Sequence, residues 1–216
     1  VTLTRSDACD YRAVFGELLD VTRIPNALHT VDVPRADPAG KVIVAAGRLN
    51  RQKGFDRLIP AFALFVERHP DWSLRIFGDG PLHSDIACLI DHHGLGERVF
   101  LRGNSRALGT ELAKASIFAL SSRYEGFPMV VLESLSHGLP VVSFDCHGPG
   151  EVITDGHDGF LVPPGDIEVF AKSLSRLAED ERLRTDMGRA ARDTSIQYGP
   201  GSVTPVWERF FAGLLE

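Results

Sequence analysis

The stretch KVIVAAGRLNRQKGF, residues 41–55, decides the fold. Its first part is a run of small apolar residues ending at Ala46, which predicts a buried strand. A polar loop of residues 47–54 follows, and from Phe55 to Arg68 the apolar residues recur at helical spacing. A strand without polar alternation that leads through a loop into an amphipathic helix is typical of a parallel sheet buried on both faces.

The same unit recurs along the rest of the chain. Further apolar runs predict strands, and stretches of helical spacing lie between and after them. We therefore predict an α/β fold, with a Rossmann-like parallel sheet and helices on both faces. Ligands of such sheets bind at the carboxyl ends of the strands. The expected strands lie at 72–77, 98–101, 117–121, 141–144 and 160–162, and the expected helices near 82–93, 108–115, 128–137, 167–179, 181–197 and 203–215.

The first 40 residues follow a different pattern. Residues 1–4 and 21–24 are candidate short strands, and Ser6 is a candidate N-cap for a helix that ends near Leu19. Residues 27–40 contain two prolines and several charges, as a linker does. One strand–helix–strand unit cannot bury itself, so we expect this segment to belong to a preceding domain.

Composition excludes several classes of protein. The chain has 216 residues and a formal net charge of −6, which argues against a general nucleic-acid binder. Its three cysteines, Cys9, Cys88 and Cys146, form no C-x-x-C pair, so neither a disulfide framework nor a zinc site is predicted. Reduced thiols of this kind suit a cytoplasmic protein. The sequence shows no signal peptide and no apolar run long enough to span a bilayer.

The loop after the first predicted strand carries Arg48 and Lys53. A guanidinium offers a planar fork of donors that suits phosphate oxygens, and an ammonium is a compact point charge. Together at the carboxyl edge of a parallel sheet, the two side chains could clamp a diphosphate. From this loop alone, two solvated surface charges remain the alternative interpretation.

The segment EGFPMVVLE, residues 125–133, follows the fourth predicted strand. Pro128 suits the first position of a helix, which leaves the early amides free to attract phosphate. Glu125 and Glu133 would flank that anion site, and carboxylates accept hydrogen bonds from vicinal hydroxyls. A sugar on one side and a ribose on the other is the simplest ligand, although a surface glutamate and a helix-capping glutamate remain the alternative. Asp145 and Glu151, around a Gly-Pro-Gly turn, are further candidates for the sugar pocket.

Glu125 and Glu133, with seven residues between them, resemble the E-x7-E signature of retaining glycosyltransferases with the GT-B fold, the large family that includes the glycogen synthases. Small departures are Ala27, where the family often has Gly, and Ser134, where Ala is common. The resemblance covers nearly the whole chain from Ile24 onward and implies the C-terminal half of such an enzyme. The matching segments, in the family's order and spacing, are residues 24–26, 47–54, 76–81, 138–142 and 158–162.

The resemblance also implies roles by position. Arg48 and Lys53 would neutralise the diphosphate and, with Glu125 at the hydroxyls of the transferred sugar, would form the catalytic set. Glu133 would bind the ribose, amides near residues 127–130 would hold sugar and phosphate, and the loops around residues 78–80 and 102–104 would frame the base. The implied substrate-binding set is Gly47, Gly78, Gly80, Arg102, Asn104, Gly126, Phe127, Pro128, Met129, Val130 and Glu133.

A retaining hexosyltransferase of this kind would move the sugar of a UDP-, GDP- or ADP-sugar to a glycan or lipid-linked acceptor, in polysaccharide or glycoconjugate synthesis. Residues 1–34 would then be the remnant of the acceptor domain plus the linker, and residues 35–216 the nucleotide-sugar-binding domain with C-terminal helices. Without the acceptor domain, the isolated chain would bind the sugar donor but not transfer the sugar. No cofactor is expected, and the absence of a D-x-D motif fits a metal-independent site.

The expected location is the cytoplasm, with the inner face of the membrane as an alternative if the full-length protein associates peripherally with lipid. Two other functions stay open: a sugar-nucleotide-binding module without transferase activity of its own, and a GT-B epimerase. A nicotinamide-binding domain is excluded, because the loop after the first strand lacks G-x-G-x-x-G.

Overall fold

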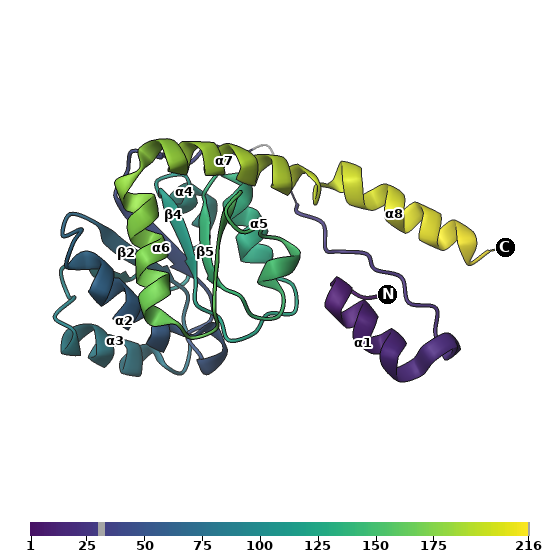
Figure 1. The fold of residues 1–216 in the computed structure, drawn as a ribbon, viewed down its shortest axis with the longest axis horizontal. Helices are drawn as coiled ribbons and strands as arrows, with labels where there is room; N and C mark the ends of the chain where they lie inside the picture. Colours follow the sequence, from purple (N-terminus) through teal and green to yellow (C-terminus); the bar gives the residue numbers. More distant parts are fainter. Residues whose placement is uncertain (30–32, 216) are drawn as a thin grey trace.

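The computed structural model of the protein describes residues 1–29 and 33–215. Six parallel strands form one sheet in the order β3-β2-β1-β4-β5-β6 (Figure 1). This order reverses direction beside β1, as in doubly wound sheets, and confirms the predicted Rossmann-like fold. The strands are β1 (Val42–Ala46), β2 (Ser73–Phe77), β3 (Val99–Leu101), β4 (Ile117–Leu120), β5 (Val141–Phe144) and β6 (Gly159–Val162).

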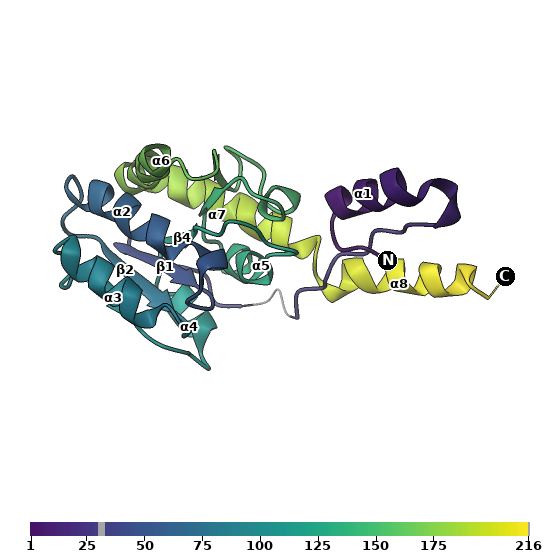
Figure 2. The same cartoon turned by 90° about the horizontal axis from the view of Figure 1, so that it is seen from below.

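Alternate residues of each strand enter different cores. In β1, Ile43 and Ala45 pack with the helices on one face, whereas Val44 and Ala46 belong to the core on the other face. Figure 2 shows the sheet between these two helical layers. The first layer holds α2 (Phe55–Val66), α3 (His83–His92) and α6 (Ile167–Glu179), and the second holds α4 (Leu108–Leu112) and α5 (Met129–Ser136).

Helix α7 (Glu181–Ile196) runs along the domain and packs closely on the end of α5. This close approach depends on two glycines. A Cβ atom on Gly188 would lie 2.4 Å from the carbonyl oxygen of Gly138, and Gly138 itself has a left-handed φ of 79°. Helix α7 can therefore place its arginines beside the chain that leads into β1.

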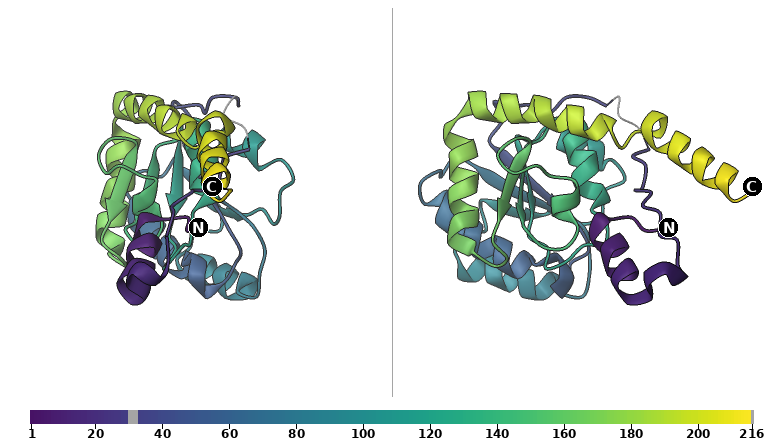
Figure 3. Two further views of the ribbon diagram at one scale, coloured as in Figure 1. Left: turned by 90° about the vertical axis from the view of Figure 1, so that its right-hand side faces the viewer. Right: turned by 45° about the vertical axis from the view of Figure 1, so that its right-hand side comes forward.

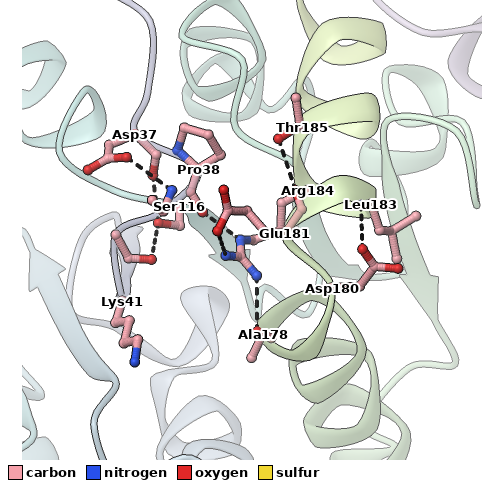
Figure 4. Close-up of polar contacts among 12 residues, drawn as sticks. Asp37, Pro38, Lys41, Ser116, Ala178, Asp180, Glu181, Leu183, Arg184 and Thr185 are labelled. Carbon is pink, nitrogen blue, oxygen red and sulfur yellow. Dashed lines mark hydrogen bonds and ion pairs between the residues drawn. The ribbon is translucent and has the colours of Figure 1, made fainter.

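Three side chains, Arg184, Arg192 and His137, hold residues 33–38, and we call this arrangement the linker clamp. Nε of Arg184 donates to the carbonyl oxygen of Pro38 at 2.7 Å, and its Nη1 donates to that of Ala178 at 3.0 Å (Figure 4). Nη1 also donates to the carbonyl oxygen of Leu177 at 2.5 Å. Only 5% of Arg184 is exposed. Its guanidinium thus joins α6, α7 and the linker.

The other two members of the clamp reach further back along the linker. Nη1 of Arg192 donates to the carbonyl oxygens of Val33 and Ser136, at 3.3 and 2.9 Å. Nδ1 of His137 lies 2.7 Å from the carbonyl oxygen of Pro34. On the β1 side, the hydroxyl of Ser116 donates to the carbonyl oxygen of Asp37 at 2.7 Å (Figure 4).

The N-terminal segment differs from its prediction in detail. Helix α1 (Arg5–Phe15) begins two residues earlier than expected, because Thr4 is the N-cap and its hydroxyl accepts from the amide of Asp7 at 3.0 Å. The amide of Ser6 instead donates to Glu151 at 3.1 Å. After α1 comes the short 3-10 helix η1 (Gly16–Leu18), and a single bridge between Thr2 and Arg23 stands where two strands were predicted.

The last helix, α8 (Pro200–Gly213), leaves α7 and projects from the domain, and α1 lies at the same end of the molecule (Figures 1 and 3). Both chain termini are found there. Helix α8 starts three residues before its prediction because Pro200 occupies its first turn. Within residues 1–29 and 33–215, no helix is long and apolar enough to cross a membrane.

Candidate functional site

A cavity of about 610 Å³ opens at the carboxyl ends of the central strands. The loops after β1, β2, β3 and β4 and the first turns of α5 line it. This is the edge of the sheet where a doubly wound fold binds its ligands. The lining residues are Ala46, Gly47, Arg48, Lys53, Phe77, Gly78, Asp79, Asn104, Ser105, Leu108, Glu125, Phe127, Pro128, Met129, Val130 and Glu133.

The loop after β1 is shaped by its own sequence. Asn50 caps the short 3-10 helix η2 (Arg51–Lys53) by accepting from the amide of Lys53 at 3.1 Å. Gly54 ends η2 with a left-handed φ of 65°. A Cβ atom at Gly54 would lie 2.0 Å from the carbonyl oxygen of Ser121, so only glycine lets this loop touch the loop after β4.

Several hydrogen bonds join the loops after β1 and β4. The hydroxyl of Ser121 donates to the carbonyl oxygen of Lys53 at 2.8 Å, and the amide of Arg123 donates to that of Gln52 at 2.7 Å. The guanidinium of Arg123 also donates two hydrogen bonds to the carboxylate of Asp56, at 2.8 and 2.6 Å. Its hydrogen bond and positive charge hold the pKa of Asp56 below its usual range. The two loops therefore form one unit.

This unit brings Lys53 against Glu125. Nζ of Lys53 lies 2.6 Å from Oε1 of Glu125, and the hydroxyl of Ser122 donates to the same oxygen at 2.5 Å. Glu125 is 6% exposed, and its amide donates to the carbonyl oxygen of His147. A buried carboxylate is thus paired with an ammonium at the wall of the cavity.

Unpaired hydrogen-bond donors face the same cavity. Arg48 is exposed and, within the described part of the chain, its guanidinium contacts no acceptor. Among those same residues, the amides of Phe127 and Val130, which line the cavity, also have no acceptor, whereas the Met129 amide donates to the carbonyl oxygen of Phe127 at 2.9 Å. Free amides at the start of a helix, together with cations, suit a bound anion.

Helix α5 begins one residue later than predicted. Pro128 is the N-cap of α5 rather than its first helical residue, because its carbonyl oxygen already accepts from the amides of Val131 and Leu132. Its ψ of 77° is not helical. The helix begins at Met129, and its open end still faces the cavity.

Glu133 lies on α5 at the other side of the opening. Its side chain reaches solvent through the cavity, but the surrounding protein removes part of its hydration and so raises its pKa. No hydrogen bond to its carboxylate occurs among the described residues. Glu133 is therefore a second carboxylate with unused acceptors.

The structure gathers the predicted site residues at one cavity, except Gly80, Arg102 and Gly126, which do not line it. Gly80 is packed into the loop, since a Cβ atom there would lie 2.5 Å from the carbonyl oxygen of Leu49. The Arg102 guanidinium stacks on the ring of Phe100, 4.9 Å from its centre.

Five lining residues were not predicted individually: Ala46, Phe77, Asp79, Ser105 and Leu108. Asp79 and Ser105 lie in the loops after β2 and β3, two and four residues beyond the strand ends, a position that could have identified them.

Glu151, a candidate for the sugar pocket, lies elsewhere. Its Oε1 accepts from the amides of Arg5 and Ser6 at 2.9 and 3.1 Å, and its Oε2 lies 3.7 Å from Arg23. Neither Glu151 nor Asp145 lines the cavity. Glu151 holds the amino end of α1 against the loop after β5.

Fold and site together define a Rossmann-like domain with a cavity lined by cations, carboxylates and free amides. Comparison with known proteins assigns it more closely. The model of the family "Glycosyl transferases group 1" matches residues 31–194, and the chain belongs to this family. Its sheet and helices form the C-terminal half of a GT-B glycosyltransferase.

Relatives work in the synthesis of polysaccharides and glycoconjugates. The chain is 42% identical over 195 residues to an exopolysaccharide phosphotransferase of Streptomyces coelicolor, covering 89% of this chain and 21% of that protein. It is 33% identical over 183 residues to the amylovoran biosynthesis glycosyltransferase AmsD of Erwinia amylovora, covering 84% and 51%. The chain thus spans well under two thirds of these relatives.

A solved structure has the same fold over nearly the whole of this chain. The crystal structure of a mutant of TarM from S. aureus, in complex with fondaparinux, alpha-GlcNAc-glycerol and UDP, superposes with a TM-score of 0.90 at 26% identity. The match covers 97% of this chain and 43% of TarM.

Proposed function

We propose that this chain is the sugar-donor-binding half of a retaining hexosyltransferase that acts on a nucleotide-diphosphate sugar. One observation carries the proposal: a single cavity holds Arg48, the Lys53–Glu125 pair, the open amino end of α5 and Glu133. The cations and free amides provide a place for the diphosphate. The two carboxylates, on either side of it, provide acceptors for the hydroxyls of a sugar and a ribose.

The arrangement suits departure of a phosphate leaving group. When the glycosidic bond breaks, negative charge grows on the diphosphate oxygens. Arg48, Lys53 and the amides of Phe127 and Val130 would stabilise that charge without rearrangement, and such preorganised donors make a large contribution to catalysis. Glu125 would orient the transferred sugar. In this proposal no cofactor or metal takes part, and the sugar keeps its anomeric configuration.

Relatives guide the remaining assignments. The UDP in the TarM complex favours a UDP-sugar as the donor, with GDP- and ADP-sugars as alternatives. The acceptor would be a glycan or a lipid-linked intermediate, because the relatives include enzymes of exopolysaccharide and amylovoran synthesis. We assign donor binding to residues 35–216 and place residues 1–34 with the acceptor domain.

The test is calorimetric titration with UDP, GDP, ADP and their sugar derivatives. Arg48→Ala and Lys53→Ala should each weaken the best ligand by about 1.5–3 kcal/mol, the range for hydrogen bonds to charged groups. Arg51→Ala is the matched control, because Arg51 is an exposed cation of the same loop that does not line the cavity.

Unchanged affinity in both variants would defeat the assignment. Binding without transfer by the full-length protein would favour the second candidate, a sugar-nucleotide-binding module.

A further inference from the structure

The two oxygens of the Glu125 carboxylate have different surroundings. Oε1 accepts two hydrogen bonds, from Ser122 at 2.5 Å and from Lys53 at 2.6 Å. Within the described residues, Oε2 has no hydrogen-bond donor, and it is not among the buried atoms that lack a partner. Oε2 is therefore the oxygen that is open to the cavity.

Ser122 lies behind this carboxylate rather than in the cavity. It is 1% exposed and does not belong to the cavity lining. The adjacent Ser121 uses its hydroxyl differently, donating to the carbonyl oxygen of Lys53 at 2.8 Å. Ser121 thus fixes the backbone of the neighbouring loop, whereas Ser122 fixes the side chain of Glu125.

Lys53 alone would be a poor anchor for Glu125. Its ammonium stands on a flexible stem and has only three protons, which a bound diphosphate would also attract. The Ser122 hydroxyl is neutral, short and buried, so an arriving phosphate does not compete for it. The serine can therefore keep the carboxylate in place while the lysine also binds the diphosphate.

We propose that Ser122 is a positioning residue of the site: it binds Oε1 of Glu125 and so presents Oε2 to a hydroxyl of the donor sugar. This inference rests on the proposed function. It adds that the contribution of Glu125 to sugar binding depends on a residue that touches no ligand.

The test compares nucleotide with nucleotide sugar. Calorimetry on the full chain uses UDP, UDP-glucose and UDP-N-acetylglucosamine as probes. The wild type should bind one of the sugar nucleotides more tightly than UDP. In Ser122→Ala, affinity for UDP should change less than about twofold, whereas affinity for that sugar nucleotide should fall roughly 10-fold, as when supporting groups of a site are removed.

A purely structural serine would weaken both kinds of ligand equally, so the selective loss identifies positioning. Ser122→Thr, which keeps the hydroxyl, should restore part of the preference for the sugar nucleotide. Ser143→Ala is the matched control, since Ser143 is a buried serine of β5 that donates to the carbonyl oxygen of Phe144 and not to the site. If Ser122→Ala does not fold, Ser122→Cys keeps the size, donates only weakly, and takes its place.

The outcomes separate the two proposals. If neither these UDP probes nor GDP, ADP and their sugar derivatives bind to the wild type, the proposed function and this inference both fail. Should the wild type prefer a sugar nucleotide and Ser122→Ala keep that preference, the positioning role alone is wrong.

Discussion

The linker clamp and the cavity both gather cationic side chains, yet they use their hydrogen-bond donors in opposite ways. In the clamp, Arg184 is 5% exposed and donates to three backbone carbonyl oxygens. At the cavity, Arg48 is exposed and contacts no acceptor among the described residues. A cation whose donors the fold already uses stabilises the fold, and a cation whose donors remain free is available to a ligand.

The acidic groups show the same contrast. Asp56 is bound on both oxygens by Arg123, whereas, among the residues that the structure describes, Glu125 keeps one oxygen open and Glu133 keeps two. Substitutions at the satisfied groups should therefore change stability, and substitutions at the open groups should change binding.

The largest expected effect comes from breaking the clamp with Arg184→Met. The methionine replaces the apolar stem but leaves buried carbonyl oxygens without donors, so the free energy of unfolding should fall by roughly 3–5 kcal/mol. Urea unfolding measures this loss. Arg182→Met, at a position whose side chain is 92% exposed, is the control and should change stability by less than about 0.5 kcal/mol.

Ligand affinity of the folded Arg184→Met protein should stay within about twofold of the wild type. A large loss of affinity would mean that the clamp and the cavity are coupled, and the contrast between them would not hold.

The next effect concerns the contact between the loops after β1 and β4. In Gly54→Ala, the left-handed φ of 65° and the close carbonyl oxygen of Ser121 should together cost about 2–4 kcal/mol of stability. Lys53 should also move away from Glu125, so affinity for the nucleotide sugar should fall as well.

Gly156→Ala is its matched control, because Gly156 has a similar φ of 72° but open space around it. That variant should show only the backbone strain, about 1 kcal/mol, with unchanged binding. Equal losses in both alanine variants would contradict the importance of the loop contact.

The sequence predicted the sheet well because its central strands β1, β4 and β5 are buried on both faces. Runs such as residues 42–46 are apolar without alternation, and the glycines and polar residues after them identify the edge where the ligand loops lie. Arg48, Lys53, Glu125 and Glu133 could be grouped for this reason, since the carboxyl ends of parallel strands meet.

What the sequence did not predict depends on distant partners. Thr4 and Ser6 are both suitable N-caps, and the choice depends on Glu151, which accepts from the amide of Ser6 across the fold. In the sequence, Arg184 has the pattern of a surface arginine on an amphipathic helix, and only the fold brings the carbonyl oxygen of Pro38 beside it. Contacts between residues far apart in the chain produce no pattern in the local sequence that could predict them.

A smaller effect should appear in Glu133→Gln. The amide keeps the shape but accepts a weaker hydrogen bond from a ribose, so nucleotide affinity should fall by about 1 kcal/mol in calorimetry. The free energy of unfolding of Glu133→Gln, in contrast, should rise relative to that of the wild type at neutral pH. Burial raises the pKa of Glu133 above its unfolded value, so the wild type loses stability as pH rises through the folded pKa, and the glutamine variant does not.

Because Glu133 is open to solvent, this gain should be below about 1 kcal/mol at neutral pH. Urea midpoints that differ equally at acid and neutral pH would show that the carboxylate is not desolvated. Glu168→Gln, on the exposed face of α6, is the control.

The smallest effect is expected for Asp56→Asn, on the satisfied side of the comparison. Arg123 lowers the pKa of Asp56 in the folded protein, so the pair contributes stability above the unfolded pKa, near 3.9. That contribution is lost as pH falls through the folded pKa. Asp56 is half exposed, so the loss should be below about 1 kcal/mol and should shrink in high salt.

Urea unfolding at pH 7 and pH 3 should therefore show the stabilities of the wild type and the variant converging at the lower pH. A difference that stays constant with pH would assign the role of Asp56 to the shape of the loop and not to its charge.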